Sequence, residues 1–177
     1  GLDFTNGANA ILELGRQLPV IAGFTDLDKG LTVSAGVISG GTRLNVVPDL
    51  AVCDFDIRVS RAKDWAGLER KFRGLRAVDK RCRIEVEGEL NRPPLERTKA
   101  GAALFGTART LAGELGFELG ETSVGGGSDG NFTAALGVPT LDGMGAVGEG
   151  AHTPGEYVLV DALPGRIALI AKLLAAL

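Results

Sequence analysis

The chain has 177 residues, 45% of them hydrophobic, which is enough to bury one substantial core or two small ones. Its net charge of -3 excludes a general attraction to nucleic acid or to an anionic membrane surface. We expect no secretion signal, because the first residues lack a charged segment followed by an apolar one. The longest apolar run, residues 162–177, carries Arg166 and Lys172 and is too short to span a bilayer. We therefore expect a cytoplasmic protein, and the start without methionine suggests a fragment.

The first half alternates the signals of helices and strands. Apolar residues recur three and four positions apart and predict two amphipathic helices, residues 9–18 and 62–77. Strict alternation of apolar and polar residues predicts three strands, residues 31–37, 51–59 and 82–86. The first helix is expected to end near Pro19, because proline removes a backbone donor. Cys53 and Cys82 fall on apolar sides of strands, where we expect reduced core residues.

The order helix, strand, strand, helix, strand is that of a split βαβ–βαβ sandwich without its first strand. One strand before Gly1 would complete a ferredoxin-like arrangement of two helices on an antiparallel sheet. The pattern stops at residues 91–94, where Pro93 and Pro94 remove two backbone donors. We therefore predict a first domain over residues 1–91.

The second half, residues 92–177, has fewer and shorter strand signals. Helices are predicted over residues 102–115, 129–136 and 161–177, and strands over residues 118–124 and 138–141. Strands that alternate with helices indicate an α/β layer with a mostly parallel sheet. Because two strands cannot make a complete sheet of that kind, we expect the C-terminal portion of a larger α/β domain.

A basic stretch, residues 61–83, holds nine Lys or Arg residues against three acidic ones. Nucleic-acid binding is one interpretation, but no aromatic residue is interleaved on the basic face. Trp65 and Phe72 belong to the apolar stripe of the predicted helix. A solvated helix face is the better interpretation, and we expect no nucleic-acid partner.

The glycine-rich segment 125–130 follows a predicted strand and precedes a short helix. Backbone amides of Gly126 and Gly127, with the Ser128 hydroxyl, could donate to a carboxylate or to another oxyanion. The segment lacks the Gly-Lys-Ser/Thr ending of a phosphate-binding loop and the glycine fingerprint of a dinucleotide site. A simple tight turn is the alternative interpretation.

His152 is the only histidine of the chain and lies in a second glycine-rich segment. Imidazole is the commonest metal ligand and acid–base group, and Glu156 could orient the ring. A zinc ion needs three or four protein ligands, whereas this chain offers one histidine and scattered acids. A structural or solvent-facing histidine is the alternative.

Several segments, taken in order along the chain, resemble those of one family. In the second half these are residues 125–130 (GGGSDG), 138–145 (VPTLDGMG) and 151–158 (AHTPGEYV). In the first half they are residues 7–11 (GANAI), 40–41 (GG), 45–48 (NVVP) and 56–58 (DIR). The chain resembles the co-catalytic zinc amidohydrolases, which include glutamate carboxypeptidase, acetylornithine deacetylase, succinyl-diaminopimelate desuccinylase and the aminoacylases.

The resemblance implies an α+β lid or dimerisation domain over residues 1–91 and the end of the catalytic domain over residues 92–177. It implies that His152 is a zinc ligand. It also implies that Arg92 grips the carboxylate of a small substrate, with Asn45 and the loop at Gly126, Gly127 and Ser128 as further contacts. A surface salt bridge at Arg92 and a plain turn residue at Asn45 are the alternatives.

The resemblance also implies what this chain lacks. Family members carry a His-x-Asp motif and a Glu-Glu pair upstream of the lid, and these supply the general base and the other ligands of two zinc ions. None of these motifs is in the sequence, so no catalytic residue is expected within it and the chain alone is predicted to be inactive. A homodimer through the lid is expected, and a non-catalytic dimerisation or substrate-binding module is the alternative function.

Overall fold

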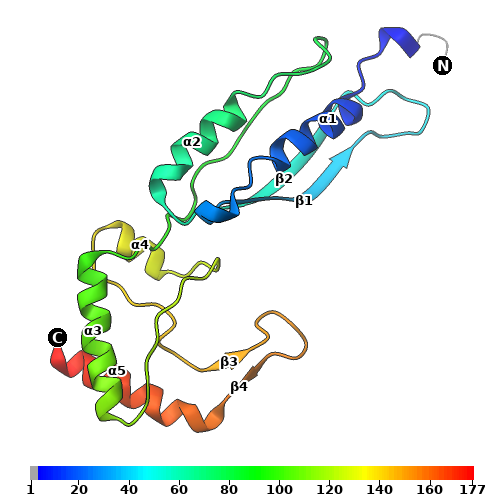
Figure 1. The fold of residues 1–177 in the computed structure, drawn as a ribbon. Coiled ribbons are helices and arrows are strands. Elements are labelled where there is room, and N and C mark those ends of the chain that lie inside the picture. Colours follow the sequence, from blue (N-terminus) through cyan, green and yellow to red (C-terminus); the bar gives the residue numbers. More distant parts are fainter. Residues whose placement is uncertain (1–3) are drawn as a thin grey trace. The chain divides into compact units, whose positions relative to one another are not determined.

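The structure, a computed structural model, describes residues 4–177. It divides into two compact units, with the division between Pro94 and Leu95 (Figure 1). Both units mix helices with small antiparallel sheets. Within the part that the structure describes, no helix is both long and apolar enough to cross a bilayer.

Over residues 4–94, the first unit contains two helices, one two-stranded sheet and two short 3-10 turns. Its elements are η1 (Phe4–Asn6), α1 (Ala10–Ala22), η2 (Leu27–Lys29), β1 (Thr32–Gly40), β2 (Ala51–Arg58) and α2 (Ala62–Arg73). Strands β1 and β2 pair antiparallel from Thr32 opposite Arg58 to Gly40 opposite Ala51, with an irregularity between Ala35 and Val37. The first four of the expected elements are therefore present.

A single cluster of apolar side chains holds this unit together. It consists of Ile21, Leu31, Val33, Leu68 and Phe72. Phe72 also meets the rings of Phe24 and Phe55 edge to face, at centroid distances of 5.4 and 5.8 Å. The cluster joins both helices to the sheet, and the predicted apolar stripe of α2 supplies two of its members.

Helix α1 passes through Pro19 and ends at Ala22, so the predicted end near Pro19 is wrong. Proline removes one hydrogen bond, to the carbonyl of Gly15, and that residue is exposed, so water can replace the donor. The helix begins as expected at Asn9, whose side chain accepts from the backbone N–H of Leu12 at 3.0 Å. Continuing the helix places Ile21, only 4% exposed, in the core.

The predicted strand at residues 82–86 does not form as a strand. Its side chains keep the expected alternation, because Cys82, Ile84 and Val86 are half-buried and their neighbours are exposed. A strand also needs a partner for its backbone groups, and within residues 4–177 β2 pairs only with β1. The segment therefore has the burial pattern of a strand without its hydrogen-bonded ladder.

The second unit is mainly helical. Its elements are α3 (Lys99–Glu114), α4 (Gly130–Ala135), β3 (Gly148–Glu149), β4 (Tyr157–Val158), η3 (Val160–Ala162) and α5 (Leu163–Ala176). Helices α3 and α5 pack against each other, and Ala108 and Ala112 of α3 are buried, as are Leu169 and Leu173 of α5. Small residues on α3 let the two helix backbones approach closely.

The two predicted strands of this unit, residues 118–124 and 138–141, are not strands in the structure, and no parallel sheet forms in its described residues. A parallel strand needs a neighbouring strand on which to form its ladder, and these segments have none. The sheet present is instead an antiparallel hairpin, in which Gly148 pairs with Val158 and Glu149 with Tyr157.

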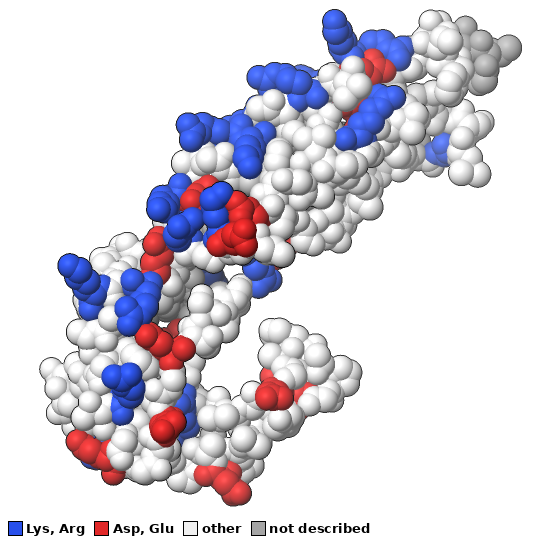
Figure 2. Space-filling view, viewed as in Figure 1, with Lys and Arg blue, Asp and Glu red and all other residues white. Residues whose placement is uncertain are grey.

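The basic stretch 61–83 lies over α2 and the segment after it, where Figure 2 shows Lys and Arg side chains gathered. Several of its arginines pair with acids of the same stretch. Arg61 contacts Asp64 at 2.7 Å, and Arg73 contacts Glu69 at 2.8 Å. The Arg73 pair is exposed, as on a solvated helix face, whereas the Arg61 pair is partly buried.

Candidate functional site

The turn that carries His152 connects the two strands of the β3–β4 hairpin. At its start, the backbone N–H and the hydroxyl of Thr153 both donate to the carbonyl of Gly150, at 3.0 and 2.7 Å. Further along, the N–H of Glu156 donates to the carbonyl of Thr153 at 3.1 Å. The turn is therefore held by its own hydrogen bonds, close to the point where strand pairing begins.

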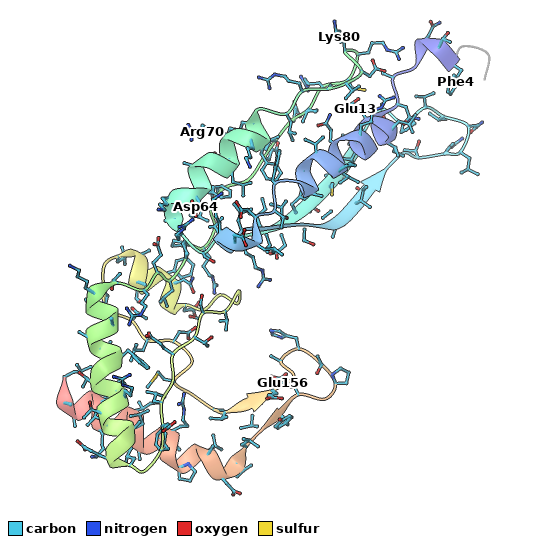
Figure 3. The ribbon with its side chains drawn as sticks, in the orientation of Figure 1. Phe4, Glu13, Asp64, Arg70, Lys80 and Glu156 are labelled. Atoms are coloured by element: carbon cyan, nitrogen blue, oxygen red, sulfur yellow. The ribbon has the colours of Figure 1, made fainter. Side chains whose placement is uncertain are left out.

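His152 has an exposed side chain and an unusual backbone. Its φ of 66° lies in the left-handed region, which favours glycine. Its backbone N–H donates to the Glu156 carboxylate, Oε2, at 3.3 Å, and Figure 3 labels Glu156 in this hairpin. Glu156 therefore contacts His152 through the backbone amide, where the sequence led us to expect an effect on the ring.

The imidazole of His152 makes no hydrogen bond within residues 4–177. Over the same residues, no group of three or more His, Cys, Asp and Glu side chains lies close enough to hold a metal ion. Because zinc needs three or four protein ligands, the described residues do not make a zinc site by themselves. His152 is at most one ligand of such a site.

The glycine-rich loop is held by Asn131, a residue that the sequence analysis did not single out. Asn131 is only 9% exposed, and its Oδ1 accepts from the backbone N–H of Ser128 at 2.9 Å. The Ser128 hydroxyl in turn accepts from the N–H of Gly130 at 3.2 Å. The amide of Ser128 is thus used inside the loop, whereas Gly126 and Gly127 are exposed.

A side chain at Gly130 would fit only if neighbouring side chains shifted slightly. A Cβ built there would lie 3.1 Å from Thr140 Cγ2 and 3.2 Å from Ser128 Oγ. The Thr140 hydroxyl also lies 2.9 Å from that of Thr133 in α4. The loop, α4 and the segment that follows therefore pack as one local structure.

Arg166 of α5 is a second residue that the sequence did not mark as part of the site. Its Nε donates to the carbonyl of Gly145 at 2.9 Å, and its terminal nitrogen donates to that of Gly143 at 2.5 Å. The guanidinium thus holds the turn that leads from residues 138–141 into the β3–β4 hairpin. No periodicity or motif could have revealed this contact, because it joins positions more than twenty residues apart.

Arg92 and Asn45 both belong to the first unit. Asn45 is exposed in the connection between β1 and β2. Arg92 is exposed next to the double proline and has a partner of its own. The structure places these two residues within the first unit, and Gly126, Gly127, Ser128 and His152 within the second.

Comparisons with known proteins agree with the resemblance seen in the sequence. Residues 4–176 match the family described as Peptidase family M20/M25/M40. The chain is 28% identical over 173 residues to carboxypeptidase G2 of Pseudomonas sp. (strain RS-16), a match that covers 95% of this chain and 41% of that protein. It is 30% identical over 176 residues to succinyl-diaminopimelate desuccinylase of Dechloromonas aromatica (strain RCB), covering 95% and 45%. The chain thus spans less than half the length of both relatives.

Proposed function

Because this chain belongs to the peptidase family M20/M25/M40, we propose that it is the substrate-gripping part of a peptidase or deacylase that cleaves an amide bond near a free carboxylate. The family match over residues 4–176 carries the proposal. The names of both relatives, a carboxypeptidase and a desuccinylase, describe amide hydrolysis of this kind. The lid would be residues 1–91, and residues 92–177 would be the end of the catalytic domain.

Each predicted contact has a chemical task in this proposal. The Arg92 guanidinium donates two parallel hydrogen bonds to the substrate's carboxylate. The exposed amides of Gly126 and Gly127 are the donors that the second unit offers to a carboxylate, and the Asn45 amide is a polar group that the first unit offers to the substrate. Asn131 keeps the loop in shape by accepting from the Ser128 amide.

His152 contributes an imidazole to the metal site that the family implies. Zinc would activate a water for attack on the amide carbonyl, and the general base and remaining ligands would come from outside residues 4–177. The described residues do not hold a metal ion on their own. Their own work is to bind and orient the substrate.

The surface of the second unit supports its place in a larger domain. Large apolar side chains stand exposed directly after α4, at Leu136 (83%), and on α5, at Ile167 (66%) and Leu174 (73%). Its buried core is small, made chiefly of two alanines and two leucines. We propose that further chain of the same enzyme covers these residues.

The test compares two proteins of different length. The 177-residue chain is assayed with N-acyl amino acids and with N-succinyl-diaminopimelate, and is titrated with zinc. We expect no turnover and only weak zinc binding that His152→Ala abolishes. Turnover by the chain alone, or tight stoichiometric zinc, would contradict the proposal.

A version extended to the length of the relatives is expected to hydrolyse at least one such substrate. In that version Arg92→Gln is expected to raise KM by about tenfold to a hundredfold, because a charge-assisted bidentate contact is lost. Arg97→Gln is the matched control, since Arg97 pairs with Glu121 at 2.9 Å on the surface. An unchanged KM in the Arg92 variant would remove Arg92 from the substrate site.

A second candidate function, self-association through the first unit, has an observation of its own. Strand β1 pairs with β2 along one edge, and Val37 and Ile38 on β1 are 62% and 59% exposed. An exposed apolar edge strand is a template for pairing with another chain. We propose a homodimer through this edge, tested by sedimentation of the whole chain.

The edge-strand variant in that test is Ile38→Lys, and the control is Val78→Lys, at a residue 66% exposed in the loop after α2. We expect a dimer that the first change weakens and the second leaves intact. A monomer at high micromolar concentration would contradict the proposal.

A further inference from the structure

His152 has a strained backbone conformation that no other described non-glycine residue adopts. Among residues 4–177 it is the only non-glycine residue with a positive φ. A side chain in the left-handed region clashes with its own backbone and is disfavoured, less so for histidine than for branched residues. The strained residue is the only histidine of the chain, which is also its candidate metal ligand.

Strain of this kind persists only where neighbouring contacts impose it. Two contacts do so here. The double hydrogen bond from Thr153 to the carbonyl of Gly150 closes the turn that contains His152. The Glu156 carboxylate accepts from the N–H of His152 itself.

The contact from Glu156 is the one that acts directly on the strained residue. A carboxylate only accepts hydrogen bonds, and a charged acceptor strengthens the bond it receives. If His152 relaxed to an ordinary helical φ near -63°, that dihedral would rotate by roughly 130° and its N–H would point away from Glu156. The imidazole would then leave the chain in another direction.

We propose that Glu156 is a positioning residue: it grips the backbone amide of His152, holds that residue in the left-handed conformation, and so aims its imidazole. This deepens the proposed function, on which the use of the imidazole rests. The hydrogen bond from the His152 amide to Glu156 lies wholly within the β3–β4 hairpin, so it does not depend on that function. Because it acts on the backbone, both ring nitrogens stay available for a ligand or a proton.

The test uses NMR of the 15N-labelled 177-residue chain. A residue with positive φ gives an unusually strong NOE between its own amide and α protons, which reports directly on His152. We expect this signal in the unmodified chain and in Glu156→Gln, which keeps an acceptor oxygen. We expect its loss in Glu156→Ala, together with exchange of the His152 amide about tenfold faster, the effect of one lost hydrogen bond.

Glu149→Ala is the matched control. Glu149 lies on strand β3 of the same hairpin, so this change removes an equal charge without touching the His152 amide. The proposal is overturned if Glu156→Ala keeps the strong NOE, or if Glu149→Ala loses it equally.

A double variant separates positioning from simple bracing of the turn. Glycine adopts positive φ without strain, so in His152→Gly the turn no longer needs the carboxylate. We expect Glu156→Ala to shift the amide signals of Thr153 and Gly155 in the unmodified background and to leave them nearly unchanged in the His152→Gly background. Equal shifts in both backgrounds would assign Glu156 a bracing role only.

These measurements need neither metal nor turnover. If Glu156 proves not to position His152, the proposed hydrolase function is unaffected. If the hydrolase function proves wrong, the contact between Glu156 and the His152 amide can still be measured.

Discussion

Replacing Glu13 by glutamine is expected to weaken the first unit, because this carboxylate joins helix α1 to the loop after α2. Glu13 is 4% exposed and is labelled in Figure 3. Its two oxygens accept from Gln17 Nε2 at 2.8 Å and from the backbone N–H groups of Val78 and Asp79 at 2.9 and 3.0 Å. Arg16 adds a longer contact at 3.4 Å. A glutamine side chain has only one oxygen to accept from these donors, and its NH2 group, itself a donor, would face the remaining ones.

The magnitude follows from the hydrogen bonds lost. Removing one hydrogen bond to a charged, buried acceptor costs about 1.5–3 kcal/mol, so we expect Glu13→Gln to lower the free energy of unfolding by roughly 2 kcal/mol at pH 7. Glu69→Gln is the matched control on α2. Its exposed pair with Arg73 is worth at most about 0.5 kcal/mol.

The effect also has a predictable pH dependence. Burial raises the pKa of Glu13, but the N–H groups of Asp79 and Val78, with Gln17 and Arg16, lower it by more, so the net pKa lies below its ordinary value of 4.5. A lowered pKa in the folded state stabilises that state above pH 4.5, and this contribution is lost as the pH falls further. The difference between wild type and Glu13→Gln should therefore shrink below pH 4.5.

Hydrogen bonds from Arg81 lower the pKa of Asp79 to about 2, so Asp79 also contributes stability that is lost in acid, but both proteins carry Asp79 and its contribution cancels in their difference. Urea unfolding followed by fluorescence of Trp65 is the assay. Trp65 is the only tryptophan and packs against the core of the first unit, so it reports on that unit alone. The reasoning is refuted if the free energies of unfolding of Glu13→Gln and wild type differ by less than about 0.5 kcal/mol at pH 7, which is the worth of an exposed ion pair. It is also refuted if their difference grows as the pH falls.

Three further predictions concern packing and the candidate site. Leu68→Ala should lower the stability of the first unit by about 3 kcal/mol in the same fluorescence assay, because Leu68 is 2% exposed in the core. Asn131→Leu should speed hydrogen exchange at the Ser128 amide about tenfold, whereas Asn131→Asp, which keeps the acceptor, should not. Gly148→Ala should abolish the cross-strand NOEs of the β3–β4 hairpin, since a Cβ there would lie 2.0 Å from the Tyr157 carbonyl oxygen. Unchanged values in any of these would contradict the corresponding contact.

The helices were predictable because their signals are local. The stripe through Leu68 and Phe72 repeats at the helical period, and Asn9 is a residue type that caps a helix start. The extent of α1 was harder to predict, since the burial of Ile21 carries the helix past Pro19. A tertiary contact there overrides a local signal.

Strands were predicted less well, because a strand depends on a partner that its own residues do not specify. β1 and β2 are adjacent in the chain and pair through one connection, and both were predicted. Residues 82–86 alternate in burial as a strand does, but no neighbouring strand pairs with them, or with residues 118–124, in the described chain. Periodicity therefore predicted the burial pattern of residues 82–86 correctly, but the ladders expected for both segments do not form.

The family was predicted correctly from motifs in their order along the chain, and the match over residues 4–176 confirms it. The residues that shape the candidate site were not predictable in the same way. Asn131, Arg166 and the amide contact of Glu156 act through backbone groups, and a backbone contact leaves no mark on residue type or spacing.

The two units differ in what determines their shape, and this bears on what the chain can show by itself. The first is held by a shared cluster of aliphatic and aromatic side chains, whereas the second has four buried apolar residues on two helices. The loops that carry the candidate site in the second unit are held instead by short-range hydrogen bonds, from Asn131 to Ser128 and from Glu156 to His152. Such contacts do not need a large core to form. The geometry of these loops should therefore be measurable in the 177-residue chain even if hydrolysis requires the rest of an enzyme, so structural tests of the site can precede functional ones.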